Sequence, residues 1–195
     1  MFFWEIIEVV PLGMNKTRRL FIGLPLSDAL RKRLVLEMDA LPQIALLPIA
    51  KDNLQVTLMF LGFVHDEDVP EMCQRVGEVA QRVESFELSF TAIKLVESAE
   101  NPKMITLVGE PSDGLRLLRE EMEKAFSAFV TERKSYSPTV TVAKIKKNKW
   151  LVLDPQPTLK EKLSILEMID TVVVYESLSL EGKRRYEPIA TFPLL

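Results

Sequence analysis

Apolar and polar residues alternate along several short stretches of the chain, and this period of two predicts β-strands. The stretches lie at residues 86–95, 104–108, 140–145, 171–180 and 186–192. Three longer stretches repeat their apolar residues every three or four positions instead, as amphipathic helices do. The mixture predicts sheets whose outer faces are covered by helices.

The three helical stretches also carry the residues expected at helix ends. Ser27 suits the N-cap of a helix that runs to about Leu41, and Pro42 ends it. Pro70 suits the first turn of a second helix, and a third is predicted from about residue 112 to residue 130. The apolar stripes are Leu30, Leu34, Met38 and Leu41 in the first helix, Met72, Val76, Val79 and Val83 in the second, and Leu115, Leu118, Met122, Phe126 and Phe129 in the third.

One short polar pattern occurs twice among the predicted strands. Gln55-Val56-Thr57 lies in the run 53–62, and Thr139-Val140-Thr141 lies in the run 137–144. On a strand, the two polar side chains of each copy project from one face while their apolar neighbours turn into the core. Two such strands can face each other across a cleft.

This recurrence resembles the 2H phosphoesterase superfamily, and within it the LigT-like RNA 2′,3′-cyclic phosphodiesterases of the 2′-5′ RNA ligase family. Members carry His-x-Thr at each of the two positions. Residues 19–26 are similar to the family's opening strand, and residues 174–182 with 186–194 are similar to its closing hairpin. The four segments follow the family's order and cover most of the chain. The resemblance implies an α+β, bilobal, duplicated fold in which two antiparallel sheets face a central cleft and helices lie outside.

The chain departs from that pattern at both histidine positions, which hold Gln55 and Thr139, while Thr57 and Thr141 match the family. In the family, one histidine is the general acid and the other the general base, and the threonines hold the phosphate. A glutamine amide does not titrate, and a threonine hydroxyl is far too weak an acid or base near neutral pH. Each lost group is worth about 10²- to 10⁴-fold in rate. The resemblance therefore makes these four residues the candidate catalytic positions and predicts a large loss of turnover.

Other positions that the resemblance assigns to the pocket have also changed. Residues 46–49 stand where members often place an aromatic and a basic residue, and residues 105–106 stand where they often place an aromatic one. Lys144 keeps the charge of a basic residue after the second motif, so Thr57, Thr141 and Lys144 are the candidate substrate-binding residues. Lysine lacks the bidentate fork of arginine, and a lost aromatic platform costs about 1–3 kcal/mol per base. Because several pocket positions have changed together, natural divergence is favoured over a laboratory knockout, which would normally alter only the catalytic residues.

The only histidine of the chain is His65, ten positions after Gln55. A strand advances about 3.3 Å per residue, so the distance along the strand is more than about 20 Å. We therefore expect His65 at the far end of the strand, in solvent, where it cannot replace either missing imidazole.

The charge of the chain is uneven. The net charge of −3 argues against a general nucleic-acid coating protein, yet residues 131–150 hold six basic residues and one acidic residue. A local positive field beside the second motif would attract an anionic ligand. The same lysines would equally suit a solvated loop and a protected edge strand, and the sequence leaves both interpretations open.

The remaining composition predicts a cytoplasmic monomer without a metal or an organic cofactor. A lone Cys73 fits a reducing compartment and a packing role, and one histidine with one cysteine gives no zinc site. Residues 1–13 are apolar but acidic, too short to span a membrane and without the basic start of a secretory signal. They are either a mis-assigned start before Met14 or an added strand or partner-binding segment. Residues 14–195 are predicted to form one bilobal domain.

Three functions follow from this pattern. The first is a degenerate cyclic-phosphodiesterase-like protein that binds a phosphate ester, such as an RNA end or a cyclic nucleotide. The second is an active enzyme on the same substrates in which a carboxylate or Tyr136 acts as the base. The third is a non-catalytic protein-interaction module in which side chains fill the central cleft that the family resemblance implies.

Overall fold

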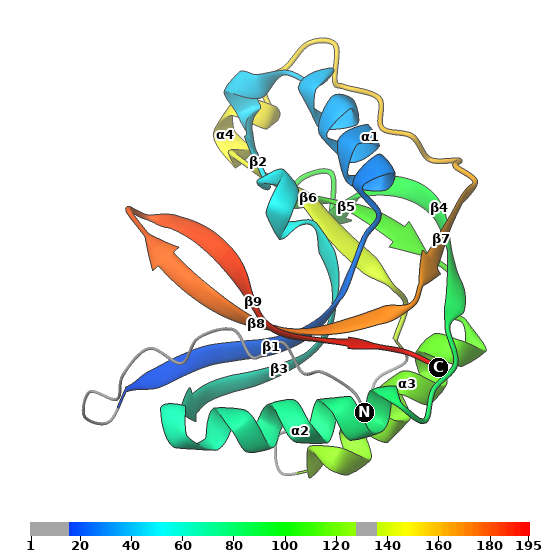
Figure 1. The fold of residues 1–195 in the computed structure, drawn as a ribbon. Helices are drawn as coiled ribbons and strands as arrows, with labels where there is room; N and C mark the ends of the chain where they lie inside the picture. Colours follow the sequence, from blue (N-terminus) through cyan, green and yellow to red (C-terminus); the bar gives the residue numbers. More distant parts are fainter. Residues whose placement is uncertain (1–15, 128–135) are drawn as a thin grey trace.

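The computed structural model describes residues 16–127 and 136–195, and its strands form two antiparallel sheets (Figure 1). Sheet A has the order β3-β1-β8-β9, and sheet B has the order β2-β6-β5-β4-β7. The strands of sheet A are β3 (Gln55–His65), β1 (Thr17–Pro25), β8 (Thr171–Leu180) and β9 (Lys183–Pro193). Those of sheet B are β2 (Leu46–Pro48), β6 (Thr139–Ile145), β5 (Pro102–Gly109), β4 (Phe86–Glu97) and β7 (Ile165–Ile169). The predicted α+β class with two antiparallel sheets is confirmed.

The helices lie outside the sheets, as predicted. Figure 1 shows α1 (Asp28–Asp39) at the top of the view and α2 (Val69–Ala80) and α3 (Asp113–Ala125) at the bottom, with the sheets between them. The Oγ of Ser27 accepts a hydrogen bond from the Leu30 amide at 3.2 Å, which confirms the predicted N-cap of α1. The predicted last turn of the third helix, with Phe129, falls outside the described residues.

Three short elements were not expected from the sequence. β2 and β7 form the two edges of sheet B, and the short helix α4 (Lys147–Trp150) follows β6. The alternation of apolar and polar residues does not predict β7, because Glu167 is buried whereas Leu166 and Met168 face solvent. The Glu167 carboxylate accepts hydrogen bonds from the Ser27 amide and, at 3.0 Å, from the Ser27 hydroxyl. These bonds fasten the start of α1 to the edge of sheet B.

One hydrophobic cluster runs through both sheets. It includes Leu20 and Val56 from sheet A and Phe90 and Ile105 from sheet B, all of them fully buried. Cys73 packs against the same cluster, as expected, and burial raises the pKa of its thiol. None of the helices in the described residues is long and apolar enough to cross a membrane.

Irregularities in β3 decide which of its side chains share a face. Its pairing with β1 shifts twice, so that Leu58 and Leu61 are extra residues opposite the partner strand. Each such bulge resets the alternation of side chains. Gly62, beside the second bulge, has φ +75, a backbone conformation that side chains disfavour. As a result, Gln55, Thr57, Phe60 and Phe63 lie on one face of β3, and Leu58 and Leu61 turn into the core.

Candidate functional site

The first polar motif occupies the start of β3, and its side chains follow the predicted alternation. Val56 is fully buried in the core, and Thr57 is half-buried on the opposite face. Gln55 is only 6% exposed, and its Oε1 has no hydrogen-bond partner among the described residues. A methyl group on Gly23 would lie 3.2 Å from Gln55 Cγ and 3.1 Å from the Tyr175 ring, so this glycine allows the close packing around the amide.

The second motif lies on β6 with the same alternation. Thr139 is exposed and Thr141 half-buried, while Val140 is fully buried. Thr141 pairs with Thr106 on the neighbouring strand β5. Thr106 is 3% exposed, and its hydroxyl also lacks a partner in the described part of the chain. Each sheet thus holds one buried polar group beside its motif threonine whose hydrogen-bonding capacity is unused.

A bulge in β6 brings Lys144 to the motif face. The pairing with β5 shifts at Val142, so that Thr106 opposes Thr141 whereas Met104 opposes Lys144. Val142 and Ala143 both turn into the core as a consequence. Strict alternation would have placed Lys144 on the buried side. The candidate phosphate contact predicted from the resemblance therefore shares a face with Thr141, and its side chain is exposed.

Two further cations lie near the motifs and were missed by the sequence analysis. Lys94 on β4 pairs with Thr106, so its exposed side chain lies on the same face as Thr141. Burial raises the pKa of Tyr175 and the Arg31 guanidinium opposes that rise, which places the charge of Arg31 near the Tyr175 hydroxyl. Lys94 is placed near the second motif by the register of the strands, and Arg31 is placed near Tyr175 by the packing of α1. No local motif marks either residue.

The two motif strands approach each other although they belong to different sheets. The hydroxyl of Tyr136, three residues before β6, donates a hydrogen bond to the backbone carbonyl of Thr57. The Arg119 guanidinium lies 4.3 Å from the centre of the Tyr136 ring. Burial raises the pKa of Tyr136 to about 12, and the Arg119 charge opposes that rise. Tyr136 is therefore protonated and engaged at neutral pH, which removes it as the substitute base considered above.

His65 lies where the sequence predicted. It is the last residue of β3, exposed and paired with Thr17, whereas Gln55 begins the same strand. The histidine is thus a full strand length from the first motif.

The lysines around the second motif do not protect an edge strand. β6 lies inside sheet B, between β2 and β5. Lys147 donates to the Asn101 side chain at 2.8 Å, and Lys146 approaches the Ile44 carbonyl at 3.4 Å. For Lys144 and Lys94, no ion pair occurs within residues 16–127 and 136–195, so both charges are available to a ligand. Arg133 and Lys134, counted in the basic stretch, fall outside the described residues.

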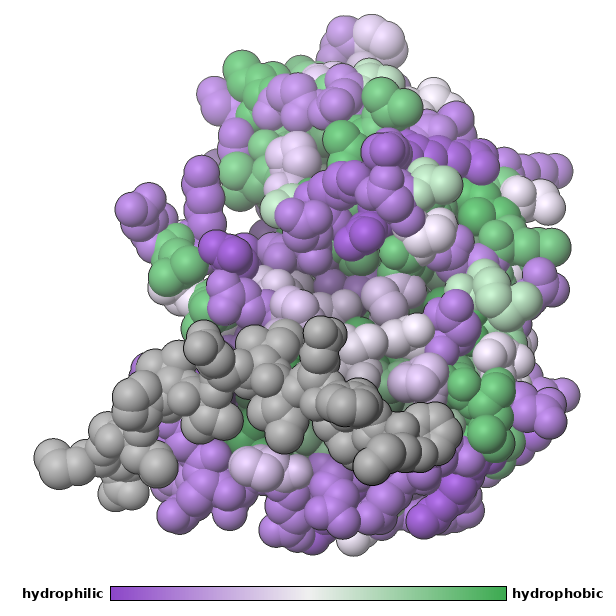
Figure 2. All heavy atoms as spheres, in the orientation of Figure 1, coloured by the Kyte–Doolittle hydropathy of each residue, from purple (hydrophilic) through white to green (hydrophobic). Residues whose placement is uncertain are grey.

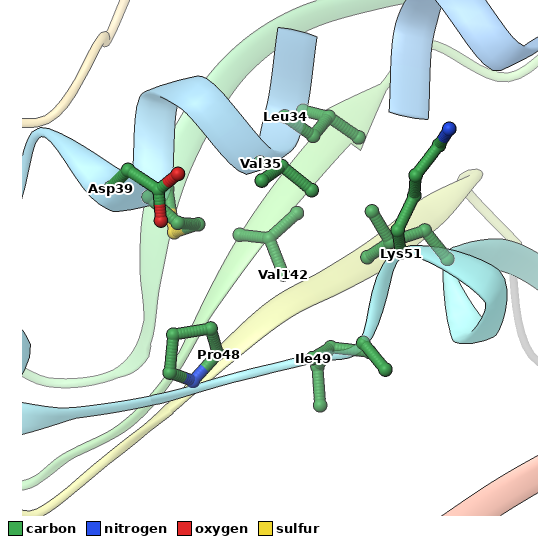
Figure 3. Close-up of a pocket in the computed structure, with 10 residues that line it drawn as sticks. Leu34, Val35, Asp39, Pro48, Ile49, Lys51 and Val142 are labelled. Carbon is green, nitrogen blue, oxygen red and sulfur yellow. The ribbon is translucent and has the colours of Figure 1, made fainter. Parts of the chain in front are cut away.

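A cavity of about 250 Å³ lies on the other side of β6, away from the motif threonines. Figure 3 shows Leu34 and Val35 of α1 above Pro48 and Ile49, with Val142 between them. The lining is apolar apart from Asp39 and Lys51, so it offers few groups to a phosphate. Within the described ranges, no three His, Cys, Asp or Glu side chains cluster as metal ligands would.

Figure 2 shows hydrophilic and hydrophobic residues mixed over the upper part of the molecule, and a pale band of intermediate hydropathy across the middle.

Comparison with known proteins gives a consistent picture. The family described as the 2′-5′ RNA ligase superfamily matches residues 48–178. An RNA 2′,3′-cyclic phosphodiesterase of Geobacillus stearothermophilus is 26% identical over 153 residues, 75% of this chain and 47% of the relative. One from Archaeoglobus fulgidus is 25% identical over 138 residues, 70% of this chain and 77% of the relative. The chain thus spans about half the length of the first relative and about three quarters of the second.

Solved structures support the same fold. The protein TT0787 of Thermus thermophilus superposes with a TM-score of 0.76 at 19% identity, over 90% of this chain and 97% of that one. E. coli LigT complexed with 3′-AMP superposes with a TM-score of 0.67 at 23% identity, over 92% and 99% of the two chains. At these identities the likeness shows the fold alone.

Proposed function

Because this chain belongs to the 2′-5′ RNA ligase superfamily, we propose that it is a degenerate relative of the RNA 2′,3′-cyclic phosphodiesterases. In this proposal it binds a phosphate ester, such as an RNA end or a cyclic nucleotide, and turns it over slowly or not at all. The distant relationship to curated cyclic phosphodiesterases supports the ligand class. The residues at the motif positions support the loss of catalysis.

One observation carries the proposal. The buried Gln55 Oε1 and Thr106 Oγ1 have no partner among the described residues, and each lies beside a motif threonine, Thr57 or Thr141. An unpaired buried polar group costs about 1–3 kcal/mol, so such groups are retained where something else bonds to them. A phosphate ester at the motif face would accept hydrogen bonds from threonine hydroxyls and from the Gln55 amide nitrogen, and Lys144 would supply charge. The Gln55 Oε1 only accepts, so its partner would be a hydroxyl or amino group elsewhere on the ligand.

The same residues explain why hydrolysis would be slow. Opening a cyclic phosphate needs a proton removed from the attacking water and a proton given to the departing ribose oxygen. Gln55 and Thr139 can donate hydrogen bonds, but neither takes up or releases a proton near neutral pH. Tyr136 stays protonated, and His65 lies at the other end of β3. Hydrogen bonding to the phosphate remains possible without the two proton transfers.

The first prediction is that restoring the two imidazoles restores catalysis. We expect Gln55→His/Thr139→His to open the 2′,3′-cyclic phosphate of an RNA oligonucleotide at least about 10²-fold faster than the natural chain. Rates are measured by chromatography of the products under identical conditions. Adding Thr57→Ala and Thr141→Ala to that variant should abolish the gain, because the threonines would no longer hold the phosphate.

Calorimetry with adenosine 2′,3′-cyclic phosphate separates binding from turnover. The natural chain should bind the nucleotide, and Thr57→Ala/Thr141→Ala should weaken that binding, whereas Thr91→Ala should not. Thr91, on β4, is a suitable control because its hydroxyl faces the Glu110 carboxylate rather than either motif. The proposal is wrong if the natural chain turns over the cyclic phosphate as fast as the histidine variant does. It is also wrong if the natural chain does not bind adenosine 2′,3′-cyclic phosphate.

A further inference from the structure

We propose that the face of sheet A that carries Gln55 and Thr57 binds the nucleotides that precede the terminal phosphate of a single-stranded RNA. This inference rests on the proposed function, because it extends the ligand beyond the motif residues. The aromatic face, as it is called here, has exposed Phe60 and Phe63 on β3 and half-buried Tyr186 on β9, with the buried rings of Phe21 on β1 and Tyr175 on β8 beneath them.

The two bulges of β3 connect this face to the first motif. They align Gln55, Thr57, Phe60 and Phe63 along one side of the strand. Phe63 lies six positions after Thr57, at most about 20 Å along the strand. A chain whose terminal phosphate lies at Thr57 can therefore continue along β3 across both rings. A regular strand would have turned Phe60 into the core.

Two exposed rings lie over a small buried cluster of aromatic side chains. Phe60 is 65% exposed and Phe63 is 73% exposed, which is unusual for phenylalanine. Behind them, Phe21 stacks on Tyr175 with ring centres 5.2 Å apart and meets the edge of Tyr186 at 4.8 Å. The Phe60 ring lies 6.1 Å from Phe21, which supports it from one side. Exposed aromatic rings on a firm base stack on nucleobases regardless of sequence.

The charges on this face suit a polyanion. Arg19 pairs with Phe63 across the strands, so its exposed side chain shares the aromatic face. Arg184 lies two residues from Tyr186 on β9, and its guanidinium donates to the Ser177 hydroxyl at 3.2 Å. Neither arginine forms an ion pair with a carboxylate in the described parts of the chain. Aromatic rings flanked by unneutralised arginines favour single-stranded RNA over an apolar protein segment.

The test compares an oligonucleotide with a mononucleotide. A short fluorescein-labelled single-stranded RNA ending in a 2′,3′-cyclic phosphate should bind the natural chain more tightly than adenosine 2′,3′-cyclic phosphate does. Phe60→Ala/Phe63→Ala should weaken binding of the RNA by about tenfold or more. The affinity for the mononucleotide should not change, because neither ring touches the terminal phosphate.

Two controls sharpen the result. Leu166→Ala/Met168→Ala removes apolar side chains of comparable exposure, 63% and 56%, from the edge of the other sheet, and should leave RNA binding unchanged. Arg19→Gln should reduce the salt dependence of RNA binding by about 0.7 in the slope of log K against log salt, the amount expected for one phosphate contact.

Each outcome distinguishes this inference from the proposed function. If the RNA binds no more tightly than the mononucleotide, or if the phenylalanine variant weakens both equally, the aromatic face is not a nucleotide site, although the terminal site stands. If the phenylalanine variant changes only the sedimentation of the protein, the face is an interface between copies of the chain, and the inference is wrong. If neither ligand binds, both proposals fail.

Discussion

Single side chains at the motifs show both how far the sequence predicts the site and where prediction stops. The alternation around Val56 and Val140 correctly placed the polar side chains on one face and the valines in the core. The far position of His65 also followed from strand length alone. Lys94 could not be found in this way, because its proximity to Thr141 depends on the register of β4, β5 and β6. Thr106 lies in the segment 105–106 that the family resemblance assigned to the pocket, but its pairing with Thr141 also depends on that register. The roles of the motif residues in ligand binding stay predictions.

Tyr136 gives a prediction about pH at the scale of one residue. Its pKa is about 12 in the folded protein and about 10 in an unfolded chain, so the contribution to stability is complete below about pH 10 and is lost as pH rises towards 12. Tyr136→Phe should cost roughly 1 kcal/mol at pH 7, because the Thr57 carbonyl loses its donor.

Urea unfolding at several alkaline pH values checks both parts of this prediction. Between pH 10 and 12 the natural chain should lose more unfolding free energy than Tyr136→Phe does. Parallel losses in the two proteins would show that Tyr136 is not held protonated by the fold.

At the scale of elements, β9 depends on a residue far from it in sequence. Asn53, at the end of the short 3₁₀ helix Lys51–Asn53, donates to the Arg184 carbonyl at 2.8 Å and accepts from the Tyr186 amide at 2.9 Å. The side chain therefore bonds to β9 as a neighbouring strand would. This contact joins the segment before the first motif to the closing hairpin.

We expect Asn53→Ala to release this part of β9 and to lower the unfolding free energy by about 1–3 kcal/mol, since two hydrogen bonds to the backbone of β9 are lost. Hydrogen exchange of the Tyr186 amide should accelerate more than that of amides in β8. Asn101→Ala, in the turn between β4 and β5, is the matched control and should leave Tyr186 unchanged. Equal protection of Tyr186 in both variants would contradict the proposed role of Asn53.

Element boundaries were predictable where capping residues and periodicity agreed, as for α1 and Ser27. They were not predictable where a tertiary contact reversed the local pattern. β7 is the clearest case, because its buried Glu167 accepts hydrogen bonds from Ser27, the N-cap of α1. The three bulges in β3 and β6 were equally invisible, since each consists of ordinary apolar residues that add to the core.

For the whole molecule, the shared core predicts cooperative unfolding. The largest hydrophobic cluster takes side chains from every layer, so neither sheet can lose its packing without exposing the other. We expect a single thermal transition, with far-ultraviolet circular dichroism and tyrosine and tryptophan fluorescence changing together. Two separate transitions would mean that the sheets form independent units despite the common core.

The bulge at Val142 has a consequence for how such chains diverge. Loss of the single codon for Val142 would leave Ala143 on the buried side and Lys144 beside Thr141, as a regular strand would have them. The strand would lose one core side chain and the carbonyl that accepts from the Ile49 amide at 2.9 Å, but the side chains of the candidate site would stay in place. An alignment gap at this position is thus compatible with an unchanged site. Residues of homologues should be matched by the strand face that they occupy rather than by their number of positions after the residue that corresponds to Thr141.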